Sequence, residues 1–353
     1  MSVTLLEKFR GCIYGAHIGS AMGAAVEGWP YQKTEETFGT LTSFESYQHY
    51  SNGWDREPGT TEDGIERQKL IITAIMEKGG RVNAEDIRAA WLNYANPNAA
   101  GWISEPFEGT LLSMAKSGIP AREIGRYCDY AGLVSFGRSC HPIGLINAGN
   151  IETAIADVME TAQLYQTTNS RGILWACVTA VAIAAATKPD ATVQSVLDAV
   201  LEIADKKWVY PELKQHLDAT RDIKDFRALR AYFDEFYSNQ GIPYYISYAN
   251  EIIVKGLCIF QMVQGNVKDA IIAAVNMGRD TDCAAAVAAG ISGALTGEAT
   301  VPAEWIERVE YATSICPHTC TKRTMKESAD GLYEAFQKRL AKEKAFVEAM
   351  DIE

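Results

Sequence analysis

Three neighbouring oxygen-bearing side chains, Asp280, Thr281 and Asp282, form what we call the C-terminal acidic cluster. An uncharged run rich in alanine and glycine follows it, from Cys283 to Gly297, and its composition predicts a buried helix. Because residues two apart do not share a helix face, Asp280 and Asp282 can point at one target only from the turn before that helix, which we expect to begin at about Asp282. A carboxylate at a helix start also caps unpaired N–H groups, so the cluster alone fits a helix cap as well as a metal site.

A second group of the same kind, the N-terminal acidic cluster, consists of Thr61, Glu62 and Asp63. It stands before a predicted helix whose apolar residues run over 65–76 and which ends at Gly79. Two acidic, threonine-bearing helix starts are explained together if they converge on hard cations, because carboxylate and hydroxyl oxygens are the ligands preferred by Mg2+, Mn2+ and Ca2+. The two clusters together therefore favour a metal centre over two separate helix caps.

A helix with a glycine at every fourth position opens the chain. Its glycines are Gly11, Gly15, Gly19 and Gly23. They would lie in one bare stripe and cost about 3–4 kcal/mol of helix propensity relative to alanine, so tight packing must offset that cost. We expect this helix at the centre of the fold, against the small residues Ala286, Gly290 and Ala294, and it should end near Glu27. Glu27 would then add a carboxylate close to the two clusters.

The composition indicates an ordinary globular chain: 353 residues, 47% hydrophobic, with a net charge of -12 and a pI near 5.0. This acidity, without a dense Lys/Arg run, argues against binding to nucleic-acid polymers. Eight cysteines without a secretory signal favour a cytoplasmic location, and the uncharged run 172–187 is too short to span a bilayer, so no membrane is expected. Cys316, His318 and Cys320 could belong to a soft-metal site, but no second half of one is visible.

Apolar periodicity and Gly/Pro breaks predict helices along nearly the whole chain, without strong strand signals. The expected helices cover 5–27, 65–78, 83–93, 109–117, 121–131, 143–164, 172–187, 191–204, 223–237, 248–263, 267–277, 282–297, 302–314 and 325–350. Residues 31–60 lack helical periodicity and are expected to form a long ordered loop. The sequence thus predicts an all-α protein with one domain over 1–353, whose charged C-terminal helix begins at about 325.

These features resemble the ADP-ribosylglycohydrolase family. The family's opening helix, G-x3-G-x3-G-D-A-x-G-x-P-x-E, is matched from Gly11 to Glu27, and its T-D-D-T motif is matched by residues 61–64. Its closing motif, G-G-D-T-D-T-x-A before a small-residue helix, is matched by residues 278–285. The order and spacing of the three motifs cover the chain from about 5 to about 310, so the resemblance is specific.

The resemblance implies a compact, orthogonal all-α bundle with a dinuclear magnesium or manganese centre that engages the ribose hydroxyls of an ADP-ribose group. It implies that Thr61, Glu62, Asp63, Asp280 and Asp282 are metal ligands. Hydrolysis at an anomeric carbon passes through an oxocarbenium-like state, which needs an activated water, a proton for the leaving group and nearby negative charge. Glu27 and Asp63 are the candidates for this acid and base chemistry.

Substrate contacts are implied at two weaker internal motifs of the family. Gly109 stands in one of them, and Ser139 and His141 stand in a loop that ends at Pro142. Trp102, in a loop with other aromatic residues, could stack on a base or on a sugar face. A structural role remains the alternative for both Trp102 and His141.

The chain departs from the family's pattern at five positions. Glu62 replaces the first, shorter aspartate of T-D-D-T. Ser20 replaces an aspartate of the opening helix, Gly64 replaces the last threonine of T-D-D-T, Cys283 replaces the final threonine of the closing motif, and Ser139 stands where the substrate loop has arginine. A thiol is a poor ligand for Mg2+, so two hard ligands are missing and the centre could hold one or two ions.

These departures leave several functions open. The leading hypothesis is a Mg2+- or Mn2+-dependent glycohydrolase of an N- or O-glycosidic bond in a small ADP-ribosyl, ribosyl or sugar substrate. The substrate could instead be a nucleoside or a small glycoside rather than an ADP-ribosylated protein. Two further hypotheses are a non-catalytic member that binds a ligand and a phosphohydrolase that uses the same carboxylates.

Overall fold

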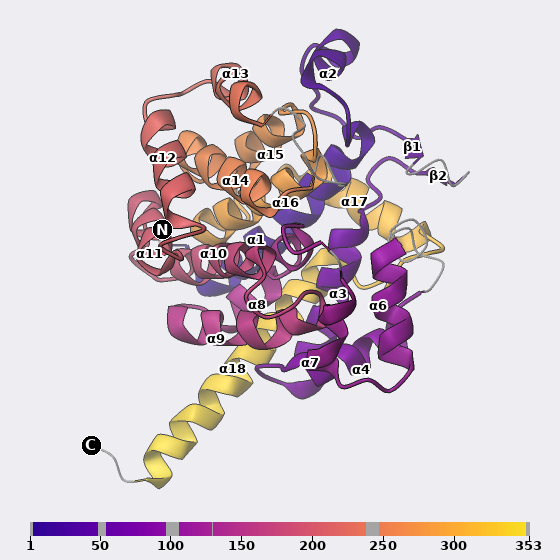
Figure 1. The fold of residues 1–353 in the computed structure, drawn as a ribbon, viewed down its shortest axis with the longest axis vertical. Helices are drawn as coiled ribbons and strands as arrows, with labels where there is room; N and C mark the ends of the chain where they lie inside the picture. The colour runs from indigo at the N-terminus through magenta and orange to yellow at the C-terminus, as the bar shows by residue number, and fades with distance from the viewer. Residues whose placement is uncertain (1–2, 49–53, 97–105, 129, 238–246, 351–353) are drawn as a thin grey trace.

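The computed structural model describes residues 3–48, 54–96, 106–128, 130–237 and 247–350. Almost all regular structure in these residues is helical (Figure 1), and the two short strands β1 (Tyr47–Gln48) and β2 (Asp55–Arg56) form a single antiparallel ladder. The predicted all-α class is therefore confirmed. None of the helices in the described ranges is long and apolar enough to cross a membrane.

Two helices from opposite ends of the sequence, α1 (Leu5–Gly23) and α16 (Thr281–Thr296), lie side by side at the centre. The start of α1 is fixed by a capping box, in which Thr4 accepts a hydrogen bond from the Glu7 N–H while the Glu7 carboxylate accepts one from the Thr4 N–H. Nearly all of α1 after Phe9 is buried. This confirms the central position expected for the glycine-striped helix.

The glycines of α1 allow its backbone to touch that of α16. A Cβ atom added at Gly15 would lie 2.3 Å from the carbonyl oxygen of Ala289, and one added at Gly19 would lie 2.8 Å from that of Ala285. Real Cβ atoms do not approach carbonyl groups so closely, so alanine at either position would force the two helices apart. The close approach offsets the helix propensity that these glycines sacrifice.

The row of α16 that faces α1 differs by one position from the expected row. We expected Ala286, Gly290 and Ala294, whereas the contacts run through Ala285 and Ala289. The expected row lies beside this closest contact, because Ala286 packs with Ala16 of α1, while a Cβ atom at Gly290 would lie 2.4 Å from the His141 ring and 3.5 Å from Cβ of Ala16. Small residues fill both rows of α16, so composition alone does not distinguish them.

In the described part of the chain, seven helices make the main contacts with this pair. They are α3 (Asp63–Lys78), α8 (His141–Ile146), α10 (Arg171–Ala186), α14 (Ala249–Val263), α15 (Val267–Val275), α17 (Ala303–Ile315) and α18 (Met325–Ala349). The outer helices are α2 (Tyr31–Phe38), α4 (Ala84–Tyr94), α6 (Pro106–Lys116), α7 (Ala121–Ile124), α9 (Ile151–Thr161), α11 (Val193–Ile203), α12 (Tyr210–Thr220) and α13 (Phe226–Phe236). Short 3-10 turns lie at η1 (Ala24–Val26), η2 (Gly125–Tyr127), η3 (Ser135–Arg138) and η4 (Ala162–Leu164). One continuous apolar core joins residues from both ends of the chain, while the single-domain assignment stays a prediction.

Four parts of the helix prediction were wrong. The helix expected over 121–131 ends at Ile124, and only the 3-10 turn η2 follows it. Residues 31–38 form α2 although a loop was expected, and α12 was not predicted at all. Only Thr34 of α2 is buried, so that helix carries no apolar stripe for a pattern search to find. The helix expected over 143–164 divides into α8 and α9, because Gly149 has a φ of 76° and Asn150 caps the second helix.

Candidate active site

The candidate site forms where the end of α1 meets the start of α16. A Cβ atom added at Gly23 would lie 2.6 Å from the backbone nitrogen of Asp282, so no larger residue fits. The Thr281 hydroxyl donates a hydrogen bond of 2.8 Å to the Gly23 carbonyl. Glu27 follows within one turn, at the end of η1. The glycine stripe thereby brings Glu27 towards the C-terminal acidic cluster.

The turn before α16 has an unusual backbone. Gly278 and Arg279 have φ values of 74° and 68°, in the left-handed region that disfavours a residue such as arginine. Arg279 is held there by Glu251 of α14, whose two carboxylate oxygens accept hydrogen bonds of 2.7 and 2.8 Å, and its carbonyl accepts one of 2.8 Å from the Gly28 N–H. This support fixes the direction of Asp280, the next residue.

The C-terminal acidic cluster serves as the helix cap. Asp280 Oδ1 accepts a hydrogen bond of 3.3 Å from the Cys283 N–H, and α16 begins at Thr281, one residue before the expected start. Asp282 lies in the first turn. The cap uses one oxygen of Asp280 and leaves the other for a second role.

The two aspartates fit a hard cation. Asp280 and Asp282 are 3% and 2% exposed, and their Oδ2 and Oδ1 atoms have no hydrogen-bond partner among the described residues. An oxygen from each aspartate and Sγ of Cys283 lie within 4.8 Å of one another. Buried carboxylate oxygens without donors are costly, and coordination of Mg2+ or Mn2+ would satisfy them. The donor chemistry of the two aspartates therefore suits the expected metal.

Cys283 is a less suitable ligand. Burial, followed by the charges of Asp280 and Asp282, raises the pKa of its thiol well above the ordinary 9.0, so the group is neutral at physiological pH. Its sulfur donates a weak hydrogen bond of 3.6 Å to Asp282 Oδ2. A protonated thiol is not a ligand for a hard cation, which agrees with the departure noted at this position.

The N-terminal acidic cluster lies at the start of α3, where Glu62 is the residue before the first turn. The Glu62 carboxylate accepts a hydrogen bond of 2.6 Å from the Tyr47 hydroxyl and forms an ion pair of 3.2 Å with Arg56. Its N–H donates to the Ser20 hydroxyl over 3.4 Å, so the serine that replaces the family's aspartate holds this cluster in place. The strands β1 and β2 supply Tyr47 and Arg56, respectively.

Asp63 is paired with an arginine from a distant segment. Arg138, at the end of η3, forms an ion pair with Asp63 and a longer one of 3.5 Å with Glu108 of α6. Its Nη1 atom also donates to Cys283 Sγ over 3.5 Å. A Cβ atom added at Gly64 would lie 3.0 Å from Cδ of Arg138, so the glycine leaves room for this side chain. Gly64 and Cys283, two of the departures from the family's pattern, thus both contact Arg138.

The acidic residues of the site raise one another's pKa values. Burial raises the pKa of Glu27 well above its ordinary 4.5, and the carboxylates of Asp282, Asp280, Glu62 and Asp63 raise it further. Burial likewise raises the pKa of Asp282, with Asp280 as the next cause. The structure brings together the carboxylates that the sequence analysis selected, and a bound cation would relieve their repulsion.

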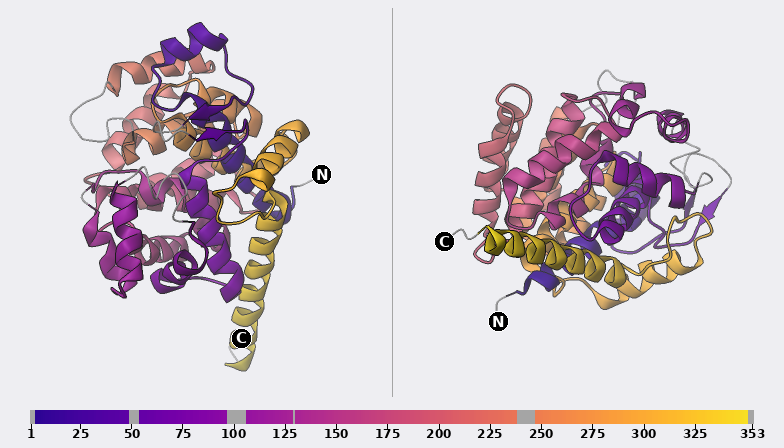
Figure 2. Two further views of the ribbon diagram at one scale, coloured as in Figure 1. Left: turned by 90° about the vertical axis from the view of Figure 1, so that its right-hand side faces the viewer. Right: turned by 90° about the horizontal axis from the view of Figure 1, so that it is seen from below.

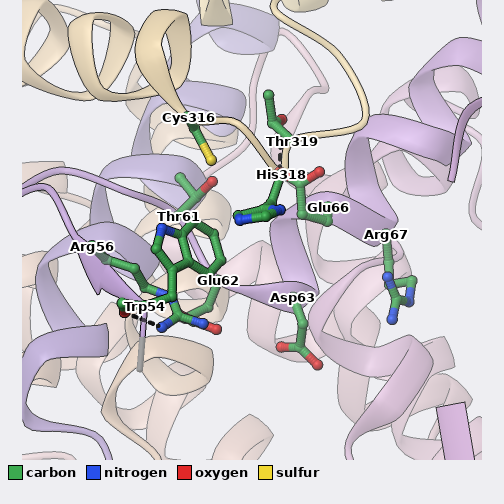
Figure 3. A pocket seen from close by; sticks show the side chains of 10 residues that line it. All are labelled: Trp54, Arg56, Thr61, Glu62, Asp63, Glu66, Arg67, Cys316, His318 and Thr319. Carbon is green, nitrogen blue, oxygen red and sulfur yellow. Dashed lines mark hydrogen bonds and ion pairs between the residues drawn. The ribbon is translucent and has the colours of Figure 1, made fainter. Parts of the chain in front are cut away.

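A small pocket opens beside the N-terminal acidic cluster (Figure 3). Thr61, Glu62 and Asp63 line it together with Trp54, Arg56, Glu66, Arg67, Cys316, His318 and Thr319. The last three residues belong to the loop between α17 and α18, which Glu66 holds by accepting hydrogen bonds of 2.9 Å from the Thr319 hydroxyl and 2.7 Å from the Cys320 N–H. Cys316, His318 and Cys320 form no metal-binding group within the described ranges.

Ser139 and His141 lie within the helix packing. The Ser139 hydroxyl donates a hydrogen bond of 3.2 Å to the Ser135 carbonyl. His141 accepts one of 3.1 Å from Gln68 at Nδ1 and donates one of 3.0 Å from Nε2 to the Ala286 carbonyl. Burial lowers the pKa of His141 to about 4, so its ring is neutral. The structure does not bring these two side chains to the carboxylates, and their role in substrate binding stays a prediction.

The other two expected substrate contacts are only partly placed. Gly109 lies half-buried on α6, directly after Glu108, which reaches Arg138. Trp102 lies outside the described residues. Both predictions remain untested.

Sequence reasoning missed two cations of the site, Arg138 and Arg56. Arg138 directly precedes Ser139, the position at which the arginine of the substrate loop was sought by counting back from Pro142. An arginine one residue away was therefore the available signal. Arg56 carried no comparable signal, because only the short ladder of β1 and β2 brings it to Glu62.

Comparisons with known proteins agree with this fold. The family model for ADP-ribosylglycohydrolase matches residues 1–342. An uncharacterized protein of Archaeoglobus fulgidus is 23% identical over 308 residues, which cover 85% of this chain and 91% of the relative. A solved structure described as an ADP-ribosylglycohydrolase-related protein complex superposes with a TM-score of 0.63 at 17% identity, over 94% of this chain and 99% of the other.

The fold is an all-α bundle with carboxylates at the starts of α3 and α16. Because the family model spans nearly the whole sequence, the chain belongs to the ADP-ribosylglycohydrolase family. The structural likeness independently supports the fold. Membership supports a glycohydrolase type of activity.

Proposed function

We propose that this chain is a divalent-metal-dependent glycohydrolase that cleaves an N- or O-glycosidic bond of an ADP-ribosyl or related ribosyl or sugar substrate. The carrying observation is the pair of buried oxygens, Asp280 Oδ2 and Asp282 Oδ1, that lack hydrogen-bond partners among the described residues. Mg2+ or Mn2+ held there would supply positive charge for binding sugar hydroxyls. The adjacent Glu27 supplies a carboxyl group for proton transfer.

The geometry favours different roles for the two acid/base candidates. The raised pKa of Glu27 suits a group that holds a proton for the leaving group. Asp63 is paired with Arg138 and lies beside the pocket, where a carboxylate suits stabilisation of a developing positive charge. Hydrolysis then requires one water, whose oxygen joins the anomeric carbon while the leaving group departs with a proton.

The substrate class within this proposal is a small molecule rather than a nucleic-acid polymer. Trp54 and His318 pack edge to face at 4.1 Å beside the pocket, and Arg56 lies 4.1 Å from the Trp54 ring. Such aromatic and cationic groups suit a base or a phosphate. Nucleosides and small glycosides also fit this description of the substrate. All eight cysteines are free thiols, which supports the proposed cytoplasmic location.

A non-catalytic, ligand-binding role is the second candidate. The observation that favours it is the Arg138 side chain, which pairs with Asp63 and leaves less of the N-terminal acidic cluster for a metal. A binder of this kind would keep the ligand pocket but show no turnover under any metal condition.

A substrate panel tests the proposal. ADP-ribosyl-arginine, ADP-ribosyl-serine, ADP-ribose, nucleosides and simple glycosides would be incubated with Mg2+, Mn2+ or EDTA. We expect a free ribosyl or sugar product only with metal, and a loss of turnover of at least about 100-fold in Asp282→Asn, because that carboxylate serves the metal. Asp198→Asn, on the outer helix α11, is the matched control and should retain wild-type turnover.

Three results would point away from the proposed activity. Phosphate release from ADP-ribose would indicate a phosphohydrolase. Ligand binding without any turnover would indicate the non-catalytic role. Wild-type turnover in Asp282→Asn would contradict a metal role for this carboxylate.

A further inference from the structure

Arg138 occupies a position within the carboxylate group where a cation is needed. Its guanidinium pairs with Asp63 and Glu108, and it also reaches Cys283 on the first turn of α16. The residue is 8% exposed, so water screens these charges little. Arg138 is therefore paired with the N-terminal acidic cluster and contacts Cys283, the residue that follows the C-terminal acidic cluster.

The surroundings are built to admit this side chain. Gly64 lacks the Cβ atom that would lie 3.0 Å from Cδ of Arg138. The Cys283 thiol accepts a hydrogen bond from Arg138 and donates one to Asp282, which links the guanidinium to the C-terminal acidic cluster. A residue at 64 with a side chain would require Arg138 to move.

The ion pairs of the site indicate how many divalent ions its carboxylates can bind. Five carboxylates meet here, from Glu27, Glu62, Asp63, Asp280 and Asp282. Arg56 pairs with Glu62 and Arg138 pairs with Asp63. Neither aspartate of the C-terminal acidic cluster has an ion-pair partner among the described residues, and these two carry the unsatisfied oxygens. One divalent ion would neutralise these two aspartates, and Glu27 is the fifth carboxylate of the group.

We propose that Arg138 acts as a built-in cation that neutralises Asp63, so that this chain binds a single divalent ion, at Asp280 and Asp282. The inference rests on the proposed metal dependence and specifies its stoichiometry. Arg138 is a positioning residue, because it holds Asp63 and touches neither the ion nor the reacting atoms.

Metal stoichiometry tests this inference without an activity assay. Equilibrium dialysis with Mn2+ would count ions per chain, and the electron paramagnetic resonance spectrum would distinguish an isolated ion from a spin-coupled pair. We expect one isolated ion in the wild type and in Arg138→Lys, which keeps the charge. Arg138→Gln removes the charge and frees Asp63, so it should bind a second ion.

Arg339→Gln is the matched control, because Arg339 is also a buried arginine but contacts the Ile146 carbonyl and Asn147, away from the carboxylates. It should bind one ion.

A folded Arg138→Gln protein that still binds one ion would overturn the inference, and so would two ions in the wild type. If Arg138→Gln fails to fold, the wild type and Arg138→Lys still test the inference, because two bound ions in either protein would contradict it. A wild-type chain that binds no ion would contradict the metal dependence itself, whereas turnover with two bound ions would contradict only the role of Arg138.

Discussion

Single residues of the site are held in an unfavourable electrostatic state. Asp280 and Asp282 meet at the start of α16 with little exposure to water, and Glu27 lies close to both. Helix caps alone do not require such crowding, since one carboxylate satisfies the orphan N–H groups. The cost is offset by binding a proton or a cation, so ligand state and stability are coupled at this site.

This coupling predicts a pH dependence of stability. The pKa values of Glu27 and Asp282 are raised above 4.5 and 3.8, so above those values the folded chain keeps protons that the unfolded chain releases. Their contribution to stability is therefore greatest at low pH and is lost as the pH rises. In EDTA, the Tm of the wild type should fall relative to that of Asp282→Asn between about pH 5 and 8. Scanning fluorimetry measures both melting points.

Metal provides the control for that experiment. Saturating Mn2+ replaces the bound protons, so the stabilisation by Mn2+ should grow with pH in the wild type and be absent in Asp282→Asn. A wild-type Tm in EDTA that rises relative to the mutant would show that the carboxylates are not crowded in solution.

The sequence located the carboxylates but not the residues that balance them. Asp280, Asp282 and Asp63 were found because acidic residues at helix starts form local patterns. Arg138 contacts Asp63 across 75 positions of sequence, through a short 3-10 turn that has no periodicity to detect. Its role depends on how separate elements approach one another, which local patterns do not encode.

At the scale of elements, the contact between α1 and α16 sets the geometry of the site. Gly23 lies against the backbone of Asp282, and Glu27 follows within a turn. The separation of the two helices therefore controls the distance between Glu27 and the candidate metal ligands.

Gly23→Ala tests this control. Its Cβ would lie 2.6 Å from the Asp282 backbone, so the helices must move apart, at a cost of about 1–3 kcal/mol. We expect a lower Tm and a several-fold weaker affinity for Mn2+, measured by calorimetry. Gly80→Ala is the matched control, because its Cβ would meet nothing closer than 4.0 Å. Equal Mn2+ affinity in the two variants would show that the contact does not position the site.

The pairing of these helices was predictable, whereas other elements were not. The glycines of α1 repeat at helical spacing, and only a close partner compensates for their cost. The row of α16 that comes closest to α1 lies one position from the predicted row, because small residues occupy two adjacent rows. The helix α2 escaped prediction because it is exposed on nearly every side and lacks an apolar stripe.

At the scale of the whole molecule, α18 is half core and half surface. Its first turns pack on α1, where Phe336 lies 5.8 Å from the Phe9 ring. Its last turns extend away from the body (Figure 2), and Phe346 and Val347 are 63% and 46% exposed. The sequence predicted a charged C-terminal helix, and this exposed second half is the part that fits the description.

Removal of residues 345–353 should therefore leave the fold intact. The Lys344–Glu348 pair that is lost is exposed and spans 3.8 Å, so its contribution is small. We expect a Tm within about 1 °C of the full chain, whereas Phe336→Ala should cost about 3–5 kcal/mol. Calorimetry on both variants checks this. A large loss of stability in the truncated chain would mean that the projecting turns contact the body.

The pairing of α1 with α16 also has a consequence during translation. Helix α1 leaves the ribosome well before its partner, which covers Thr281–Thr296. At about 5–20 residues per second, this helix waits roughly 14–55 s for the surface that buries it. Its apolar and glycine-rich faces are open to chaperones and to other nascent chains throughout that interval. The yield of folded protein should therefore depend more on elongation rate and chaperone supply than the stability of the finished fold suggests.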